Sequence, residues 1–189
     1  PDEVQKAVAI LKKEKNLNDY VRFVNVILKE PSKETVLNFT AGDPIQREAY
    51  IELLDNKEEK TYEAIVSITN EKVISFKYIP GVQPSILPEE FAECEATVKK
   101  HPDFQAALLR RGINDPDLVM VDPWSAGYFG IPEHEGKRLA RAICWIRKFP
   151  NDNGYAYPLT GIVVYVDLNK MEVLSVEDHG VRKMPTVDG

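Results

Sequence analysis

Carboxylates are plentiful in this sequence but form no evident catalytic pair, whereas histidines and cysteines are few and their spacing fits no common reactive motif. The three histidines, His101, His134 and His179, show neither His-x-His nor His-Glu-x-x-His spacing. Each has proline, glycine or acidic neighbours, as at a loop or the end of an element. Because a metal site needs several convergent ligands, we expect surface histidines and no metal centre.

Other reactive groups are also isolated. Ser125 lies in "DPWSAGYFG", which lacks the Gly-x-Ser-x-Gly pattern of a nucleophile elbow. The segment "GIPEHEGKR" has one residue too many between its glycines for a phosphate loop, and Arg138 replaces the required hydroxyl residue. Cys94 and Cys144 each stand among apolar residues and are predicted to be buried free thiols. The acidic run "EEFAECE" is interpreted as a solvated helix face, so the residues predict no catalytic site.

Aromatic residues near two prolines are the remaining candidates for a function. Aromatic side chains on rigid turns commonly line pockets, but they also fill cores and anchor loops. The residues alone leave both interpretations open. The group comprises Trp124, Tyr128, Phe129, Tyr155 and Tyr157, beside Pro123 and Pro158.

Bulk properties exclude several classes of protein. The 189 residues suffice for one large domain or two small ones. The formal net charge of -6 and the sequence pI of about 5.2 argue against a nucleic-acid partner. No apolar run approaches the roughly 20 residues that cross a bilayer, so we expect a soluble chain without a membrane partner. The compartment is not assigned.

The first half of the sequence is predicted to be one helix followed by about five antiparallel strands. The helix begins at Asp2, with Val4, Val8 and Leu11 on one face. The strands are "DYVRFVNVILKEP", "ETVLNF", "REAYIELLD" and the two arms of a hairpin over 61–81. In the hairpin, one inner face comprises Ala64, Val66 and Ile68, and one face of the return strand comprises Ile74, Phe76 and Tyr78.

The segment "IPGVQPSILPEE" resists both helix and sheet, and it separates predicted domains at 1–84 and 85–189. In the second domain, helices are expected to begin at Pro88 and Pro102. The second helix directs Phe104, Ala107 and Leu108 inward. "KRLARAICWIRKF" is compatible with helix or strand, and its run of β-branched and aromatic residues favours a strand. A second hairpin follows at 157–180.

The two hairpins resemble each other. Asn70 matches Asn169 in the turn, and "VISF" from Val73 matches "VLSV" from Val173, with one extra residue in the second turn. Amphipathic hairpins converge on such patterns, but the order of the surrounding elements also matches. The sequence therefore predicts an α+β fold of two related modules, each with a helical layer on one antiparallel sheet.

Five stretches in the same order resemble copper-containing primary-amine oxidases. They are "PDEVQKAVAILK", "RFVNVILKEP", "PEEFAECE", "RRGINDPDLVMVDPWSAGYFG" and "NDNGYAYPLTGIVVYVDL". They span nearly the whole chain and resemble the two small domains that precede the catalytic domain in that family. The resemblance implies two tandem cystatin-like domains in the N-terminal, non-catalytic region of a homodimeric oxidase.

The resemblance also implies what the absent part would contain. The family oxidises primary amines to aldehyde, ammonia and hydrogen peroxide, using copper and a topaquinone in a C-terminal catalytic domain. This chain lacks the Asn-Tyr-Asp/Glu motif and the paired histidines for those cofactors, so none is expected here. In some members the small domains line the outer substrate channel. Carried over by motif, the lining residues would be Phe91, Pro123, Trp124 and Tyr155.

Two alternatives place the chain outside an oxidase. A free-standing cystatin-like or PepSY-like binding or inhibitor module could use the same helix-on-sheet unit, although the Gln-x-Val-x-Gly loop of cystatins is missing. An interaction domain that recruits partners at a sheet edge is the third interpretation.

Overall fold

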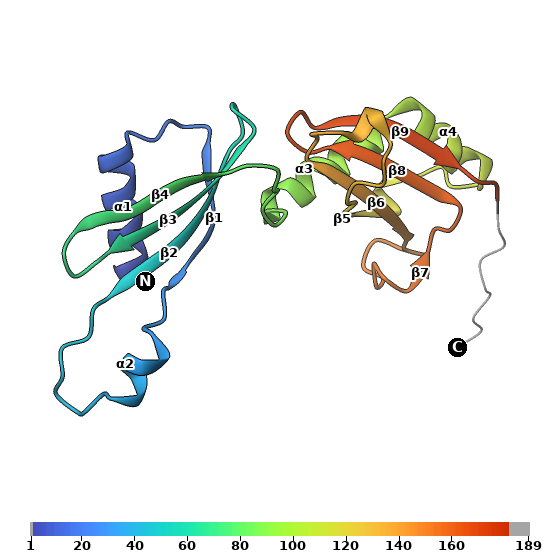
Figure 1. Ribbon diagram of the computed structural model, residues 1–189. Coiled ribbons are helices and arrows are strands. Elements are labelled where there is room, and N and C mark those ends of the chain that lie inside the picture. Colours follow the sequence, from blue (N-terminus) through green and yellow to red (C-terminus); the bar gives the residue numbers. More distant parts are fainter. Residues whose placement is uncertain (1, 182–189) are drawn as a thin grey trace. The chain divides into compact units, whose positions relative to one another are not determined.

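The computed structural model describes residues 2–181, and the chain falls into two compact units that divide between Ser85 and Ile86. The outer ends of the two predicted domains, residue 1 and residues 182–189, lie outside the described residues. Each unit has its own antiparallel sheet, its own helical layer and its own hydrophobic core (Figure 1). The predicted α+β class is confirmed.

The first unit is a four-stranded sheet in the order β1-β2-β3-β4, with helix α1 on one face. Ala7 and Leu11 of α1 are buried against that face, whereas Val4, near the start of the helix, is 44% exposed. The helix therefore begins one turn before its packed face. The bounds are α1 Asp2–Lys15, β1 Val21–Leu28, α2 Lys33–Leu37, β2 Glu48–Asp55, β3 Lys60–Ser67 and β4 Lys72–Ile79.

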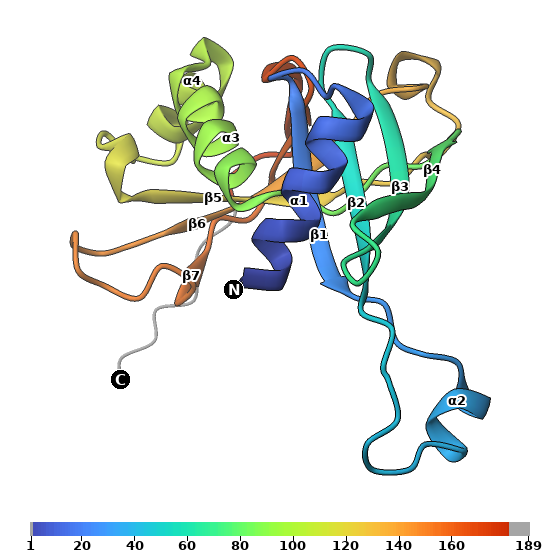
Figure 2. The ribbon, with the colours of Figure 1, turned by 90° about the vertical axis from the view of Figure 1, so that its left-hand side faces the viewer.

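The predicted strand "ETVLNF" is wrong, because this segment forms the short helix α2. The Ser32 side chain accepts a hydrogen bond from the Thr35 backbone N–H at 3.1 Å, which is an N-cap. The β-branched residues that suggested a strand have no sheet neighbour here. The segment between β1 and β2 instead projects beyond the end of the sheet, as both views show (Figures 1 and 2).

The return strand β4 also departs from simple alternation. Ile65 pairs with Ser75 and Val66 pairs with Val73, so Ile74 is an extra residue in a β-bulge. The bulge turns Val73 and Phe76 toward the core and leaves Ile74 49% exposed. The prediction that Ile74 shares a face with Phe76 is therefore wrong, whereas the inner face of Ala64, Val66 and Ile68 is confirmed.

The second unit has the sheet order β5-β6-β8-β9, with the short strand β7 paired to β6. Helices α3 and α4 cover one face of this sheet (Figure 2). The segment that was ambiguous between helix and strand is β6, as predicted. The bounds are α3 Pro88–Lys100, α4 Pro102–Arg110, η1 Pro116–Leu118, β5 Val119–Ser125, η2 Pro132–His134, β6 Leu139–Ile146, β7 Tyr157–Pro158, β8 Ile162–Asp167 and β9 Glu172–Asp178.

Both helices begin at a proline, as predicted, and bury one side. In α4 the inward residues are Phe104, Ala107 and Leu108, which confirms the prediction. Cys94 of α3 and Cys144 of β6 are buried free thiols, also as predicted. Burial raises the pKa of both thiols to about 12, because an apolar surrounding disfavours the thiolate.

The acidic run at the start of α3 is not a solvated face throughout. Glu90 is 1% exposed and forms a bidentate ion pair with Arg138, which is 2% exposed. Arg138 Nε donates to Glu90 Oε1 and its Nη2 donates to Oε2, each at 2.8 Å. Glu90 Oε2 also accepts from the Leu87 backbone N–H at 2.7 Å, at the first turn of α3. The bonds from Arg138 and from the Leu87 N–H thus compensate for burying this carboxylate.

The two units repeat one plan, in which a helical layer precedes an antiparallel sheet with the order β1-β2-β3-β4 in the first unit and β5-β6-β8-β9 in the second, where β7 is an additional short strand. Their last hairpins match residue for residue at an offset of 100. Ser67 pairs with Lys72 and Asp167 with Glu172, so the connecting loops have equal length. The predicted extra residue in the second turn is therefore wrong. The bulge recurs as well, with Leu174 in the place of Ile74.

Candidate functional site

Strand β5 places its side chains alternately on the two faces of the second sheet. Val121 and Pro123 are buried on the face that carries the core, whereas Trp124 on the opposite face is 60% exposed. Asp122 shares the face of Trp124, because residues two apart in a strand point the same way. The Pro123 side chain therefore lies on the core-facing side of the sheet, opposite to Trp124, the other predicted channel residue of β5.

Asp122 joins two of the predicted residues. Its Oδ2 accepts a hydrogen bond from Trp124 Nε1 at 3.0 Å and from the Tyr155 hydroxyl at 3.4 Å. The two aromatic side chains are 60% and 56% exposed, whereas Asp122 is only 9% exposed. The structure thus brings Trp124 and Tyr155 together around a carboxylate that sequence reasoning missed.

The loop after β6 carries Tyr155 to this position. Asn153 Oδ1 accepts from the Tyr155 backbone N–H at 3.0 Å, and Asp152 Oδ2 accepts from the Lys148 N–H at 2.9 Å. Such side-chain contacts fix the loop backbone locally. Gly154 lets the loop lie close to the sheet, since a Cβ there would meet Met120 Sδ at 2.8 Å. The Tyr155 ring then packs edge-on against Trp145, with ring centroids 5.4 Å apart.

The other aromatic candidates lie apart from this contact. Phe91 on α3 is 39% exposed, and the structure records no ring contact that joins it to Trp124 or Tyr155. Tyr128 and Phe129 follow β5 and are 56% and 83% exposed. Tyr157 in β7 has the Lys148 ammonium 4.5 Å from its ring centroid. Among the aromatic candidates, Trp124 and Tyr155 thus share a polar partner, Asp122.

Nothing among residues 2–181 fits a metal centre, because no three His, Cys, Asp or Glu side chains converge to hold an ion. His179 is exposed, but the other two histidines are partly buried rather than fully at the surface. His134 packs on Tyr165 with centroids 4.9 Å apart. His101 lies between α3 and α4, and its Nδ1 is buried without a hydrogen-bond partner in the described part of the chain. No helix within the described range is both long and apolar enough to span a membrane.

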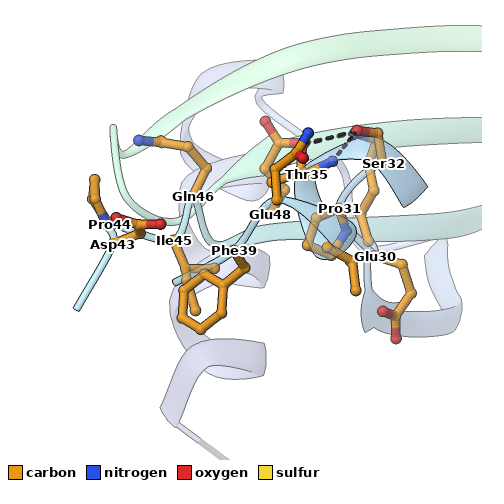
Figure 3. Close-up of a pocket in the computed structure, with 13 residues that line it drawn as sticks. Glu30, Pro31, Ser32, Thr35, Phe39, Asp43, Pro44, Ile45, Gln46 and Glu48 are labelled. Atoms are coloured by element: carbon orange, nitrogen blue, oxygen red, sulfur yellow. Dashed lines mark hydrogen bonds and ion pairs between the residues drawn. The ribbon is translucent and has the colours of Figure 1, made fainter. Parts of the chain in front are cut away.

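A separate pocket of about 600 Å³ lies in the first unit, between the ends of β1 and β2 (Figure 3). Helix α2 and the segment after it form the pocket, and the Ser32 cap of α2 lies in its wall. Its apolar lining includes Val36, Phe39 and Ile45, each about half exposed. Its polar lining mixes both signs of charge, as in the Lys29–Glu48 ion pair at 2.7 Å. No convergent set of reactive groups is present in this lining.

A signal for Asp122 exists in the sequence. In "VMVDPWS" an acidic residue interrupts an apolar strand and stands two residues before an indole N–H donor. Strand alternation places these two on one face. The contribution of Tyr155 comes from a loop 33 residues away in sequence, and no local pattern indicates that contact.

The chain thus consists of two tandem helix-on-sheet units with a half-exposed aromatic pair on the second, and sequence comparison identifies its family. The family model described as "Copper amine oxidase, N3 domain" matches residues 89–188. A second, "AGAO-like N2 domain", matches residues 1–76. The chain belongs to the copper amine oxidase family and corresponds to its N-terminal N2 and N3 domains. The resemblance seen in the five sequence stretches is confirmed.

Individual relatives agree. A primary amine oxidase from Arthrobacter sp. (strain P1) is 39% identical over 188 residues, covering 99% of this chain and 28% of the relative. A peroxisomal copper-containing diamine oxidase from Nicotiana tabacum is 35% identical, covering 91% of this chain and 26% of the relative. The crystal structure of a copper-containing benzylamine oxidase from Hansenula polymorpha shares the fold, with a TM-score of 0.73 over 92% of this chain and 28% of that chain at 19% identity. This chain therefore spans about a quarter of the length of these relatives.

Proposed function

We propose that this chain is the non-catalytic N-terminal region of a copper- and topaquinone-dependent primary-amine oxidase. In that parent enzyme a primary amine is converted to an aldehyde, ammonia and hydrogen peroxide. The proposal rests on one observation above all: the N2 and N3 family models match in tandem and together cover nearly the whole chain. A free-standing inhibitor or binding module is not favoured by these matches.

The cofactors and main partners of the proposed enzyme belong to its C-terminal catalytic domain. The described residues offer no group that fits a copper ion, so we derive no chemical step on this chain. Its own contribution is structural. Two separately packed cores provide rigid sheets, and the outer face of the second sheet presents aromatic side chains. The parent is proposed to be a homodimer that acts on a primary amine.

We further propose that Trp124 and Tyr155 form part of the outer wall of the substrate channel, with Phe91 as a further wall residue. Half-exposed aromatic rings would provide the apolar surface of such a wall. This surface would exclude water and contact the tail of an amine. Pro123 contributes differently, because its side chain is buried and it supports the strand beneath Trp124. The two predicted domains, 1–84 and 85–189, are proposed as the two structural units of this region.

The test compares the full-length gene product with the 189-residue chain. Purified protein is assayed for bound copper and for hydrogen peroxide formed on addition of a primary amine. We expect copper and turnover only in the full-length product. Stoichiometric copper or turnover in the 189-residue chain would overturn the non-catalytic assignment, and a full-length product without amine-dependent peroxide would overturn the oxidase assignment.

A further inference from the structure

Asp122 is placed unusually for an acidic residue on the outer face of a sheet. It is 9% exposed on the sheet face opposite to α3 and α4, and the Trp124 and Tyr155 side chains both contact its carboxylate. Within residues 2–181 its hydrogen-bond partners are the Trp124 indole and the Tyr155 hydroxyl, and it makes no ion pair. A buried carboxylate needs such donors, so all three side chains depend on one another.

We propose that Asp122 is a positioning residue, which fixes Trp124 and Tyr155 as one rigid aromatic unit and thereby sets the selectivity of the channel rim for amine tails. The second part rests on the proposed function of these two rings. The first part stands on the geometry of this chain alone.

The physical reason lies in the small number of rotatable bonds. A tryptophan or tyrosine side chain has two rotatable bonds that move its ring, so holding one polar atom leaves the ring little freedom. A half-exposed Trp124 without a partner would sample several rotamers. A hydrogen bond to a carboxylate is about twice as strong as a neutral one, and the 3.0 Å bond from the Trp124 indole offsets the rotamer entropy that fixing this ring costs. The 3.4 Å contact of the Tyr155 hydroxyl is longer and contributes less.

The position of the two rings in the fold supports the same role. Trp124 lies on a strand that pairs with β6, and Tyr155 lies on a loop held by its own side-chain contacts. Asp122 is the hydrogen-bonding link between these two elements at the rim. The Trp145 ring packs edge-on against Tyr155, and its indole Nε1 makes no hydrogen bond within the described residues. Loss of the carboxylate would therefore free the exposed indole first.

The first experiment measures how freely the indole moves. The chain has two tryptophans, so Trp145→Phe leaves Trp124 as the single emitter. In that background we compare Asp122→Leu, which removes the acceptor, with Asp122→Asn, which keeps an acceptor oxygen without charge. Asp117→Leu is the matched control, because Asp117 is exposed and its side chain makes no recorded contact in the described chain. The readouts are time-resolved fluorescence anisotropy and the melting temperature.

We expect a fast, nanosecond depolarisation of Trp124 in Asp122→Leu, its partial suppression in Asp122→Asn, and no change in Asp117→Leu. An indole that stays rigid in Asp122→Leu would overturn the positioning role. An Asp122→Asn variant as mobile as Asp122→Leu would also overturn it, because acceptance of the hydrogen bonds would then not be what matters.

The second experiment uses the full-length enzyme and separates this inference from the proposed function. For a bulky arylalkylamine, we expect Asp122→Leu to raise KM roughly three- to tenfold with kcat unchanged, and methylamine to be unaffected, as for the loss of one binding contact. A mobile indole with unchanged KM values would refute the rim assignment while leaving the positioning role intact. A lower kcat for both amines would overturn the selectivity claim.

Discussion

The buried ion pair between Glu90 and Arg138 gives the sharpest test of how the second unit is held together. We predict that Arg138→Met destabilises this unit by about 3–5 kcal/mol, because it leaves a carboxylate without its cation in the core. Both side chains are no more than 2% exposed, so water cannot replace the lost partner. The change is a large fraction of the roughly 5–15 kcal/mol that stabilises a typical domain.

The double variant Glu90→Leu with Arg138→Met is expected to be more stable than Arg138→Met alone. Removing both charges also removes the desolvation cost, whereas loss of the bond from the Leu87 backbone N–H to Glu90 costs about 1 kcal/mol. Urea denaturation followed by tryptophan fluorescence measures the difference selectively, since Trp124 and Trp145 both lie in the second unit.

The matched control is Arg110→Met, which removes an exposed arginine that pairs with Asp178 at a site where a second arginine remains. We expect a loss of about 1 kcal/mol or less there. If Arg138→Met and Arg110→Met cost the same, the buried pair contributes no more than a surface pair. If the double variant is as unstable as Arg138→Met, the cost comes from lost packing rather than from an uncompensated charge.

Three further outcomes follow from single contacts. Gly161→Ala should lower the free energy of unfolding by at least about 1 kcal/mol more than Gly136→Ala does, as measured by urea denaturation. Both glycines have positive φ, but of these two only Gly161 would place its new Cβ 2.5 Å from a backbone oxygen. Equal losses in the two variants would contradict this clash. Cys94 and Cys144, with thiol pKa values of about 12, should resist an aromatic disulfide reagent at pH 8 until urea is added, and prompt labelling of the folded chain would contradict their burial. Two arginines lower the pKa of Asp178 in the folded state. The ionised Asp178 therefore contributes to the free energy of unfolding above about pH 4, and this contribution is lost as the pH falls toward the lower pKa of the folded state. The difference in stability between the unaltered chain and Asp178→Asn should shrink in acid, and a constant difference from pH 7 to 2 would contradict the pKa shift.

The sequence predicted the elements whose signals are local. The helices at Pro88 and Pro102 begin where proline fits a first helical position. The strand at β6 follows from its run of β-branched and aromatic residues. The helix α2 was missed, because "ETVLNF" carries β-branched residues and its helical state depends on one cap at Ser32 and on the absence of a neighbouring strand.

Features that depend on contacts distant in sequence were not predictable from one chain. Glu90 and Arg138 lie 48 residues apart, and each has charged sequence neighbours that suggest an exposed segment. Asp122 was missed for the same reason, since the hydrogen bond that it accepts from Tyr155 comes from a loop 33 residues away. The bulge at Ile74 breaks the alternation that the hairpin sequence suggests, and no residue type marks it.

The recurrence of that bulge has a consequence for engineering. At the same place in both hairpins, one backbone path accepts "NEKVIS" in one unit and "KMEVLS" in the other, with Glu71 and Met171 both at positive φ. Residues 67–75 and 167–175 therefore have the same length and the same strand register, and their backbones could replace each other. A chimera that exchanges them would retain register in each sheet, and its tolerance would depend on side-chain contacts such as the Lys6–Glu71 ion pair.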